Sequence, residues 1–174
     1  MDRMWSPWRS QYLHDAEQEH RPDGEGSVFS RIAAAPERDS EHLVLWRGEY
    51  LFVVMNLYPY NNGHLLLVPY RAVTDYEALT TAEQAELAAL IGRAMGWLRQ
   101  TLAPHGFNVG LNQGAASGAG IPDHLHVHLV PRWRGDTNFM PVTADVRVVP
   151  EALRDTYQKL RAAIEDDTSG APAP

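Results

Sequence analysis

The chain has 174 residues, of which 44% are apolar, so it is long and apolar enough to form one globular domain with a core. Its formal net charge is -7, which argues against nonspecific binding to nucleic acid, because such binding depends on many Lys and Arg contacts to phosphate. The chain has no cysteine, which excludes disulfides and thiolate metal ligands and fits a reducing compartment.

Residues 1–26 are predicted to form an N-terminal arm that is separate from the domain. The segment lacks the apolar core of a signal peptide, and its second half is polar and interrupted by Gly and Pro. Trp5 and Trp8 are expected to dock the arm onto the body or onto a partner subunit, because two exposed indoles are unusual on a surface. The longest apolar runs, such as residues 65–68, are too short to span a membrane. We therefore expect a soluble, cytoplasmic protein that binds neither membranes nor nucleic acid.

The domain is predicted to span residues 27–165 and to begin with a short helix over residues 28–35. Three strands follow over residues 42–47, 50–56 and 64–69, which are rich in Val, Leu, Phe and Tyr. Short turns separate these runs, as expected for strands that pair in hairpin order.

One long helix is predicted over residues 81–103, because its apolar residues recur at helical spacing. Thr80 and Glu83 have the spacing of a capping box at its start. Gly92 and Gly96 lie one turn apart on this helix. We expect both glycines to pack closely against the sheet.

Two more strands are predicted over residues 107–111 and 124–130, and Pro131 is expected to stop the second one. A terminal helix should open at Pro150, and residues 166–174 should be a disordered tail. Hairpin strands followed by a helix and further strands predict an α+β fold. It would contain an antiparallel sheet of about five strands, one long helix and a C-terminal helix.

Three histidines alternate with apolar residues along the predicted strand: His124, His126 and His128. Because side chains alternate between the two faces of a strand, the three imidazoles would share one face, roughly 7 Å apart. This pattern has three interpretations: a polar face that arises by chance, a metal site, or nucleophilic catalysis on phosphorus. The small-residue loop over residues 114–120 favours catalysis, because its backbone N–H groups can approach an anion closely. The loop lacks the Lys-Ser/Thr ending of a P-loop.

The run His124-Leu125-His126-Val127-His128-Leu129-Val130 resembles the signature of the histidine-triad (HIT) family. A second match is the Asn-rich turn and Gly-His strand over residues 56–69. More narrowly, residues 4–9, 58–64 and 132–140 are similar to the diadenosine tetraphosphate phosphorylase-like branch of that family. The resemblance implies the HIT fold and covers most of the chain.

The resemblance implies that His126 attacks a phosphorus atom and carries a transient nucleotidyl group. His128 would contact a phosphate oxygen, while His124 and His64 would hold the central ring in register. Asn56 would contact the ribose. The remaining residues would line the phosphate path: Asn112, Gln113, Gly114, Ser117, Gly118 and Gly120.

The residues after the strand have two interpretations each. Trp133 either flanks the nucleotide or packs against the body, and neither account is favoured. Asp136 and Asn138 either position the far phosphates or cap a turn.

The function that this resemblance implies is cleavage of dinucleoside polyphosphates, with inorganic phosphate as the acceptor and ADP plus ATP as the products. One alternative is a diadenosine tetraphosphate or nucleoside phosphoramidate hydrolase that releases AMP. A second is an AMP-binding interaction protein with weak catalysis, and a third is a three-histidine metalloenzyme. The family is commonly homodimeric, so we expect a homodimer.

Many relatives carry a Cys-x-x-Cys pair that binds zinc together with two histidines. The matching positions here are Ser27, Ser30 and Ala72, which leaves only His124 of the four ligands. Serine hydroxyls are poor ligands for zinc. We therefore expect no structural zinc and no other cofactor.

Overall fold

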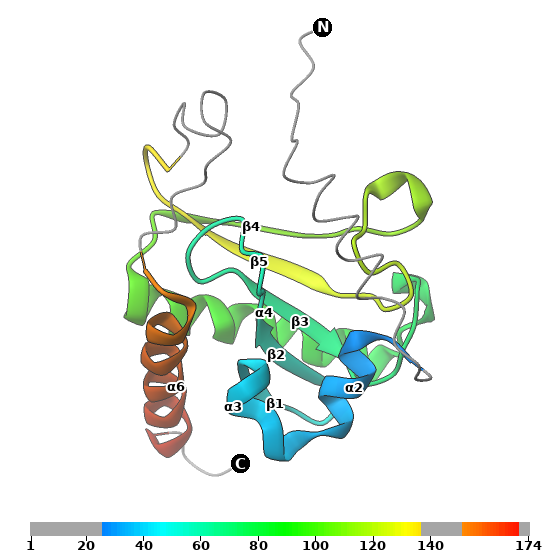
Figure 1. Ribbon diagram of the computed structural model, residues 1–174, viewed down its shortest axis with the longest axis horizontal. Helices are drawn as coiled ribbons and strands as arrows, with labels where there is room; N and C mark the ends of the chain where they lie inside the picture. Colours follow the sequence, from blue (N-terminus) through cyan, green and yellow to red (C-terminus); the bar gives the residue numbers. More distant parts are fainter. Residues whose placement is uncertain (1–25, 137–150, 171–174) are drawn as a thin grey trace, which may run out of the picture.

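The computed structural model describes residues 26–136 and 151–170. Five strands in these ranges form a single sheet in the order β1-β2-β3-β5-β4, and all neighbouring pairs are antiparallel (Figure 1). This confirms the predicted α+β fold. The strands are β1 Val44–Arg47, β2 Leu51–Met55, β3 Leu65–Pro69, β4 Gly106–Leu111 and β5 Val127–Arg132.

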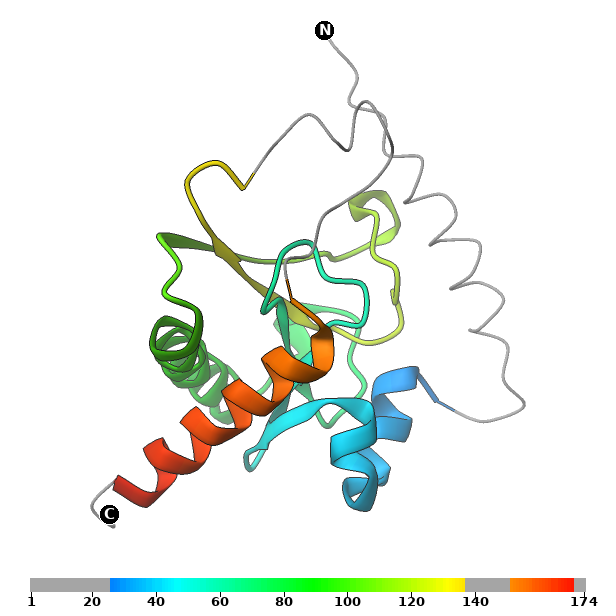
Figure 2. The same ribbon diagram turned by 60° about the vertical axis from the view of Figure 1, so that its left-hand side comes forward.

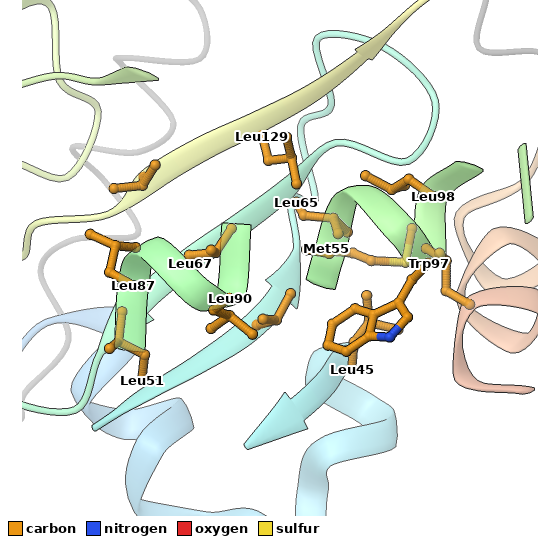
Figure 3. Close-up of a cluster of buried hydrophobic side chains, with 14 of the residues drawn as sticks. Leu45, Leu51, Met55, Leu65, Leu67, Leu87, Leu90, Trp97, Leu98 and Leu129 are labelled. Carbon is orange, nitrogen blue, oxygen red and sulfur yellow. The ribbon is translucent and has the colours of Figure 1, made fainter. Parts of the chain in front are cut away.

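The long helix α4, Thr81–Leu102, covers one face of the sheet. Its predicted capping box is present, because the side chain of Thr80 accepts from the Glu83 N–H at 3.2 Å and the Glu83 carboxylate accepts from the Thr80 N–H at 2.6 Å. The buried residues of the helix and the inward side chains of the strands form the larger core, drawn in Figure 3: Leu45, Leu51, Met55, Leu65, Leu67, Leu87, Leu90, Trp97, Leu98 and Leu129.

The two glycines of α4 do not pack as predicted. Gly92 and Gly96 are both exposed, and a Cβ atom at either position would meet nothing within 4 Å. The residue that fills the space against the core is Ala94, between them on the inner side of the helix. The prediction of close packing is therefore wrong.

Helix α2, Val28–Ala34, lies on the opposite face of the sheet from α4 (Figure 2). Its two buried side chains, Phe29 and Ile32, pack against strand residues that alternate with those of the larger core. This arrangement makes a second, smaller apolar cluster of Phe29, Ile32, Val44, Phe52, Val54, Leu66 and Val68. Short helical turns complete the described ranges: η1 Pro36–Arg38, α3 Asp39–His42, η2 Tyr76–Ala78 and η3 Ala115–Ser117.

The last helix, α6, spans Leu153–Gly170 and packs beside α4 and β1 (Figure 1). Its Tyr157 hydroxyl donates to the Val44 carbonyl at 3.2 Å. Residues 166–170 are helical, so the predicted disordered tail begins too early. The helix is held to α4 near its end, because Asp167 accepts hydrogen bonds from the Trp97 indole N–H at 3.0 Å and from Arg93 at 3.1 Å.

A strand is expected over residues 124–130. Strand β5 instead begins three residues later, at Val127, and ends two residues later, at Arg132. It begins later because the Leu125 N–H donates to the Val73 carbonyl at 2.7 Å, outside the strand ladder. Pro131 does not stop the strand. The last residue of β5 that pairs with β3 is Leu129, so at Pro131 the strand is bonded only to β4. Proline has no backbone N–H, and none is needed there toward β3.

Residues 1–25 of the predicted arm, with Trp5 and Trp8, lie outside the described residues. Asn138 also lies outside them. Among the helices that are described, none is both long and apolar enough to cross a membrane.

Candidate active site

The four predicted histidines lie along the antiparallel pair β3–β5, with His64 just before β3 and His124 beside its last residue, Pro69, although only one of the four lies on a strand as predicted. His128 is on β5, where it pairs with Leu66 on one side and Gly110 on the other. Because Leu66 belongs to the smaller apolar cluster, His128 faces the same side of the sheet as α2. His124 and His126 lie in the segment that leads into β5, and His64 lies just before β3.

His126 is buried, with 5% of its surface exposed. Its Nδ1 atom lies 2.8 Å from the His124 carbonyl oxygen, which can only accept a hydrogen bond. The ring proton is therefore on Nδ1, and the lone pair is on Nε2. Burial is the main cause that lowers the pKa of His126 below its usual value, so the ring stays neutral near pH 7.

His124 is fixed by hydrogen bonds to both ring nitrogens. Its Nε2 atom donates to the Pro69 carbonyl at 2.8 Å, so its Nδ1 atom is the acceptor. The acceptor lies 2.6 Å from the hydroxyl oxygen of Ser27, which is the N-cap of α2. The ring is fully buried, and this burial lowers the pKa of His124.

His64 and His128 form a relay that starts at a backbone N–H. The Tyr60 N–H donates to Nδ1 of His64 at 3.0 Å, so the proton of neutral His64 is on Nε2. That nitrogen lies 3.0 Å from Nδ1 of His128 and donates to it. Neutral His128 consequently carries its own proton on Nε2. Its ring centroid is 4.9 Å from that of His126. The His126 ring, with a lone pair on Nε2, therefore lies beside the His128 ring, with a proton on Nε2 that it can donate.

Two aromatic neighbours, Phe29 and Tyr60, hold these rings in place. Phe29 packs on His126 at 5.1 Å between ring centroids and on His124 at 5.6 Å. Tyr60 stacks on His128 at 5.6 Å with an interplanar angle of 17°. The Phe29 contacts keep the His124 and His126 imidazoles in an apolar setting, which favours their neutral forms.

Asn56 belongs to the turn that supports His64. Its side-chain oxygen accepts from the Tyr58 N–H at 3.0 Å, and its amide nitrogen lies 3.3 Å from Nδ1 of His64. In this structure the Asn56 amide therefore organises the loop. Its contact with a ribose stays a prediction.

The loop after β4 is shaped by two glycines with left-handed backbone angles, Gly114 at φ 79° and Gly118 at φ 75°. Between them, the Ser117 hydroxyl donates to the Gly114 carbonyl at 2.8 Å. The pair Leu111–Val127 is the last one between β4 and β5, so Asn112 follows β4 at the level of His126.

Gln113 is directed away from the role predicted for it. Its side-chain oxygen accepts from the Tyr76 N–H, and its amide nitrogen donates to Glu77, each at 2.9 Å. Both ends of the side chain are thus used to tie the loop to η2. A phosphate contact by this side chain would require these two bonds to break.

The turn after β5 favours the capping account of Asp136. Its carboxylate accepts from the Trp133 N–H at 3.0 Å and forms an ion pair with Arg132 at 2.7 Å. The same carboxylate accepts from the Asn61 amide at 2.8 Å, which links the His64 loop to the end of β5. Trp133 is half-buried, and its contact with a nucleotide stays a prediction.

Comparison with known proteins identifies the family. A sequence model of the HIT domain matches residues 37–135, more than half of the chain. The chain belongs to the HIT domain family. It is 44% identical over 161 residues to the AP-4-A phosphorylase of Mycobacterium tuberculosis, covering 92% of this chain and 83% of that protein.

Two further HIT-domain comparisons extend this result. Over 93 residues the chain is 30% identical to the asymmetrical Bis(5'-nucleosyl)-tetraphosphatase of Schizosaccharomyces pombe, covering 53% of this chain and 50% of that protein. A zinc-bound histidine triad family protein from Mycobacterium smegmatis has the same fold, with a TM-score of 0.67 at 24% identity over 84% of this chain and 98% of that one.

Some residues that position the histidines of this HIT domain were not predicted from the sequence. Phe29 acts across a long sequence separation, and no local pattern marks it. Asn61 lies in the Asn-rich turn over residues 56–69, but its bond to Asp136 joins distant segments. Tyr60 lies in the same turn, but the sequence does not reveal that its backbone N–H sets the tautomer of His64.

Proposed function

We propose that this HIT-domain protein is an enzyme that cleaves dinucleoside polyphosphates, with His126 as the nucleophile. The observation that carries the proposal is the hydrogen bond from Nδ1 of His126 to the His124 carbonyl, which leaves the Nε2 lone pair for attack. A neutral imidazole is a good nucleophile toward phosphorus near neutral pH. The similarity to an AP-4-A phosphorylase along 92% of the chain supports the same substrate class.

In the first step, Nε2 of His126 bonds to the α-phosphorus as the P–O bond to the leaving nucleoside polyphosphate breaks. The ring then carries a positive charge, which the His124 carbonyl stabilises through the Nδ1–H. His128 donates from Nε2 to an oxygen of the phosphorus centre, while its other nitrogen is held by His64. The result is a nucleotidyl group on His126.

In the second step, an acceptor oxygen bonds to the same phosphorus while the Nε2–P bond breaks, and the free imidazole returns. We propose that inorganic phosphate is this acceptor, so that diadenosine tetraphosphate gives ADP and ATP. The name of the M. tuberculosis relative supports phosphorolysis, whereas the S. pombe relative is named a tetraphosphatase. With water as the acceptor, the products would be AMP and ATP.

The acceptor is tested by incubating the protein with diadenosine tetraphosphate with and without inorganic phosphate and separating the nucleotides. We expect ADP and ATP in equal amounts, formed only with phosphate. Formation of AMP at the same rate in both reactions would show a hydrolase. Binding of AMP without any turnover would instead support the interaction-protein alternative.

The nucleophile is tested with His126→Gly and, as a control, His105→Ala, which replaces an exposed histidine outside the site. We expect His126→Gly to lose turnover and the acid-labile nucleotidyl label that forms on the wild-type protein with α-labelled substrate. The control should keep both. Full activity in His126→Gly would rule out the covalent mechanism.

We further propose that residues 112–120 line the phosphate path. The left-handed glycines and the position of Asn112 at the level of His126 support this assignment. Gly120 and Ser117 are half-buried in the same loop. Within this loop, backbone N–H groups are better placed as phosphate donors than the Gln113 side chain, which is bound to η2.

We also propose a homodimer formed by pairing of the β4 edges of two copies. The other edge of the sheet, β1, is covered by α6, whose Arg161 donates to the Leu45 carbonyl at 2.8 Å. In contrast, the central residues of β4 are exposed, and Val109 has 43% of its surface open to solvent. Light scattering should give twice the chain mass, and Val109→Lys should shift it toward the monomer. A monomeric wild-type protein would contradict the proposal.

A further inference from the structure

A serine hydroxyl holds His124 at a position where the resemblance to zinc-binding relatives implies a metal ligand. The Ser27 Oγ atom is 2.6 Å from Nδ1 of His124 and 3.1 Å from the Ser30 Oγ atom. Because Nε2 of His124 donates to a carbonyl, the proton in the shorter contact belongs to Ser27. Ser27 then accepts from the Ser30 hydroxyl and from the Ser30 backbone N–H at 3.1 Å.

This donor set does not fit zinc. A structural zinc site uses four ligands drawn from thiolates and imidazoles, whereas the matching positions here hold two hydroxyls, an alanine and one histidine. The histidine already uses both nitrogens in neutral hydrogen bonds. Among the described residues, no group of three or more His, Asp or Glu side chains is arranged to hold a metal ion.

The hydrogen bonds of Ser27 lead directly to the proposed nucleophile. His124 is held at both ring nitrogens, and its own carbonyl accepts from Nδ1 of His126 at 2.8 Å. Phe29, between the two serines on α2, packs on both imidazoles. A shift of His124 would therefore change the position of the His126 ring and the nitrogen that carries its proton.

We propose that Ser27, Ser30 and His124 form a metal-free serine clasp, in which Ser27 is a positioning residue for the nucleophile His126. The clasp joins α2 to the segment before β5 by hydrogen bonds in place of a metal ion. This inference rests on the proposed role of His126. It assigns to Ser27 a part in turnover that goes beyond capping α2.

The test compares Ser27→Ala, Ser27→Thr and Thr80→Ala in the full chain, purified without a histidine tag. Ser27 and Thr80 are both N-cap residues, so replacing either by Ala removes a helix cap, but Thr80 lies at the start of α4 and has no part in the clasp. We expect Ser27→Ala to lower kcat for diadenosine tetraphosphate about tenfold with little change in KM, because the nucleophile is misplaced while substrate binding remains.

Ser27→Thr keeps the hydroxyl and should restore most of kcat. Thr80→Ala should lower the unfolding midpoint about as much as Ser27→Ala, while its kcat stays at the wild-type value. Equal kcat in Ser27→Ala and the wild-type protein would overturn the proposal, and so would an equal loss of kcat in Thr80→Ala.

Two measurements do not depend on activity. Metal analysis of the wild-type protein should find no stoichiometric zinc, and one tightly held zinc ion per chain would overturn the clasp. In nitrogen-15 spectra, the Nδ1 signal of His124 should be that of an unprotonated acceptor and should move in Ser27→Ala. An unchanged signal would also overturn the clasp. If the wild-type protein shows neither turnover nor a nucleotidyl-histidine, the proposed function fails, while these two measurements still test the clasp.

Discussion

Replacing Phe29 by leucine tests whether the apolar setting of His126 sets the pH range of the enzyme. The Phe29 ring is 3% exposed and lies 5.1 Å from the His126 ring. Deleting a buried aromatic side chain to alanine costs about 3–5 kcal/mol; leucine keeps much of the volume, so we expect a loss of about 1–2 kcal/mol in the free energy of unfolding. The domain should therefore stay folded.

The smaller side chain should let water approach His126. Burial is the main cause that lowers the pKa of His126, so partial hydration raises that pKa toward its usual value of 6.5. Because the attacking ring must be unprotonated, activity is lost as the pH falls through this pKa. The acid limb of kcat/KM should consequently lie at higher pH in Phe29→Leu than in the wild-type protein.

The assay is the pH profile of kcat/KM, with urea unfolding of each variant. Ile32→Val is the matched control, because Ile32 lies in the same apolar cluster and its loss of one methyl group costs about 1 kcal/mol. We expect the control to keep the wild-type acid limb. An acid limb that is unmoved in Phe29→Leu, or moved equally in both variants, would refute the reasoning.

Two further predictions concern stability. Arg71 and the capping box hold the pKa of Glu83 at about 2, below its usual value of 4.5, so its contribution to stability is present above pH 4.5 and is lost as the pH falls toward 2. Glu83→Gln should remove this contribution, which is about 1 kcal/mol because Arg71 is half exposed. In urea unfolding, the free energy of unfolding of this variant should depend less on pH in the acid range than that of the wild-type protein, and an unchanged pH dependence would contradict the prediction. Gly92→Ala and Gly96→Ala should each raise the free energy of unfolding by about 0.5–1 kcal/mol, because both positions are helical, exposed and open to a Cβ atom. Thermal unfolding checks this gain, and a loss would show a packing role that the structure lacks.

The sequence predicts the order and type of the main elements because period-two and helical spacing of apolar residues is a local signal. It fails where a distant contact decides. Leu125 bonds to Val73 instead of extending β5, and Asp167 bonds to Trp97 and prolongs α6. Gly92 and Gly96 lie off the apolar stripe of Leu90, Ala94 and Leu98 that faces the core, so the expectation that they pack against the sheet conflicts with the helical spacing itself.

The candidate site shows the same division. Local spacing marks His124, His126 and His128 as a set, and the family resemblance adds His64. The protonated nitrogen of each ring depends on carbonyl, N–H and hydroxyl partners from other segments, which no motif reports. The ties of the Gln113 side chain to η2 are likewise visible only in three dimensions.

The open space at Gly110 allows a probe to be attached next to this site. Gly110 pairs with His128 across β4 and β5, and a Cβ atom there would meet nothing within 4 Å. The protein has no cysteine, so Gly110→Cys would create its single thiol. A fluorophore attached to that thiol would sit beside the histidines and report nucleotide arrival and departure in real time, without any other residue competing for the label.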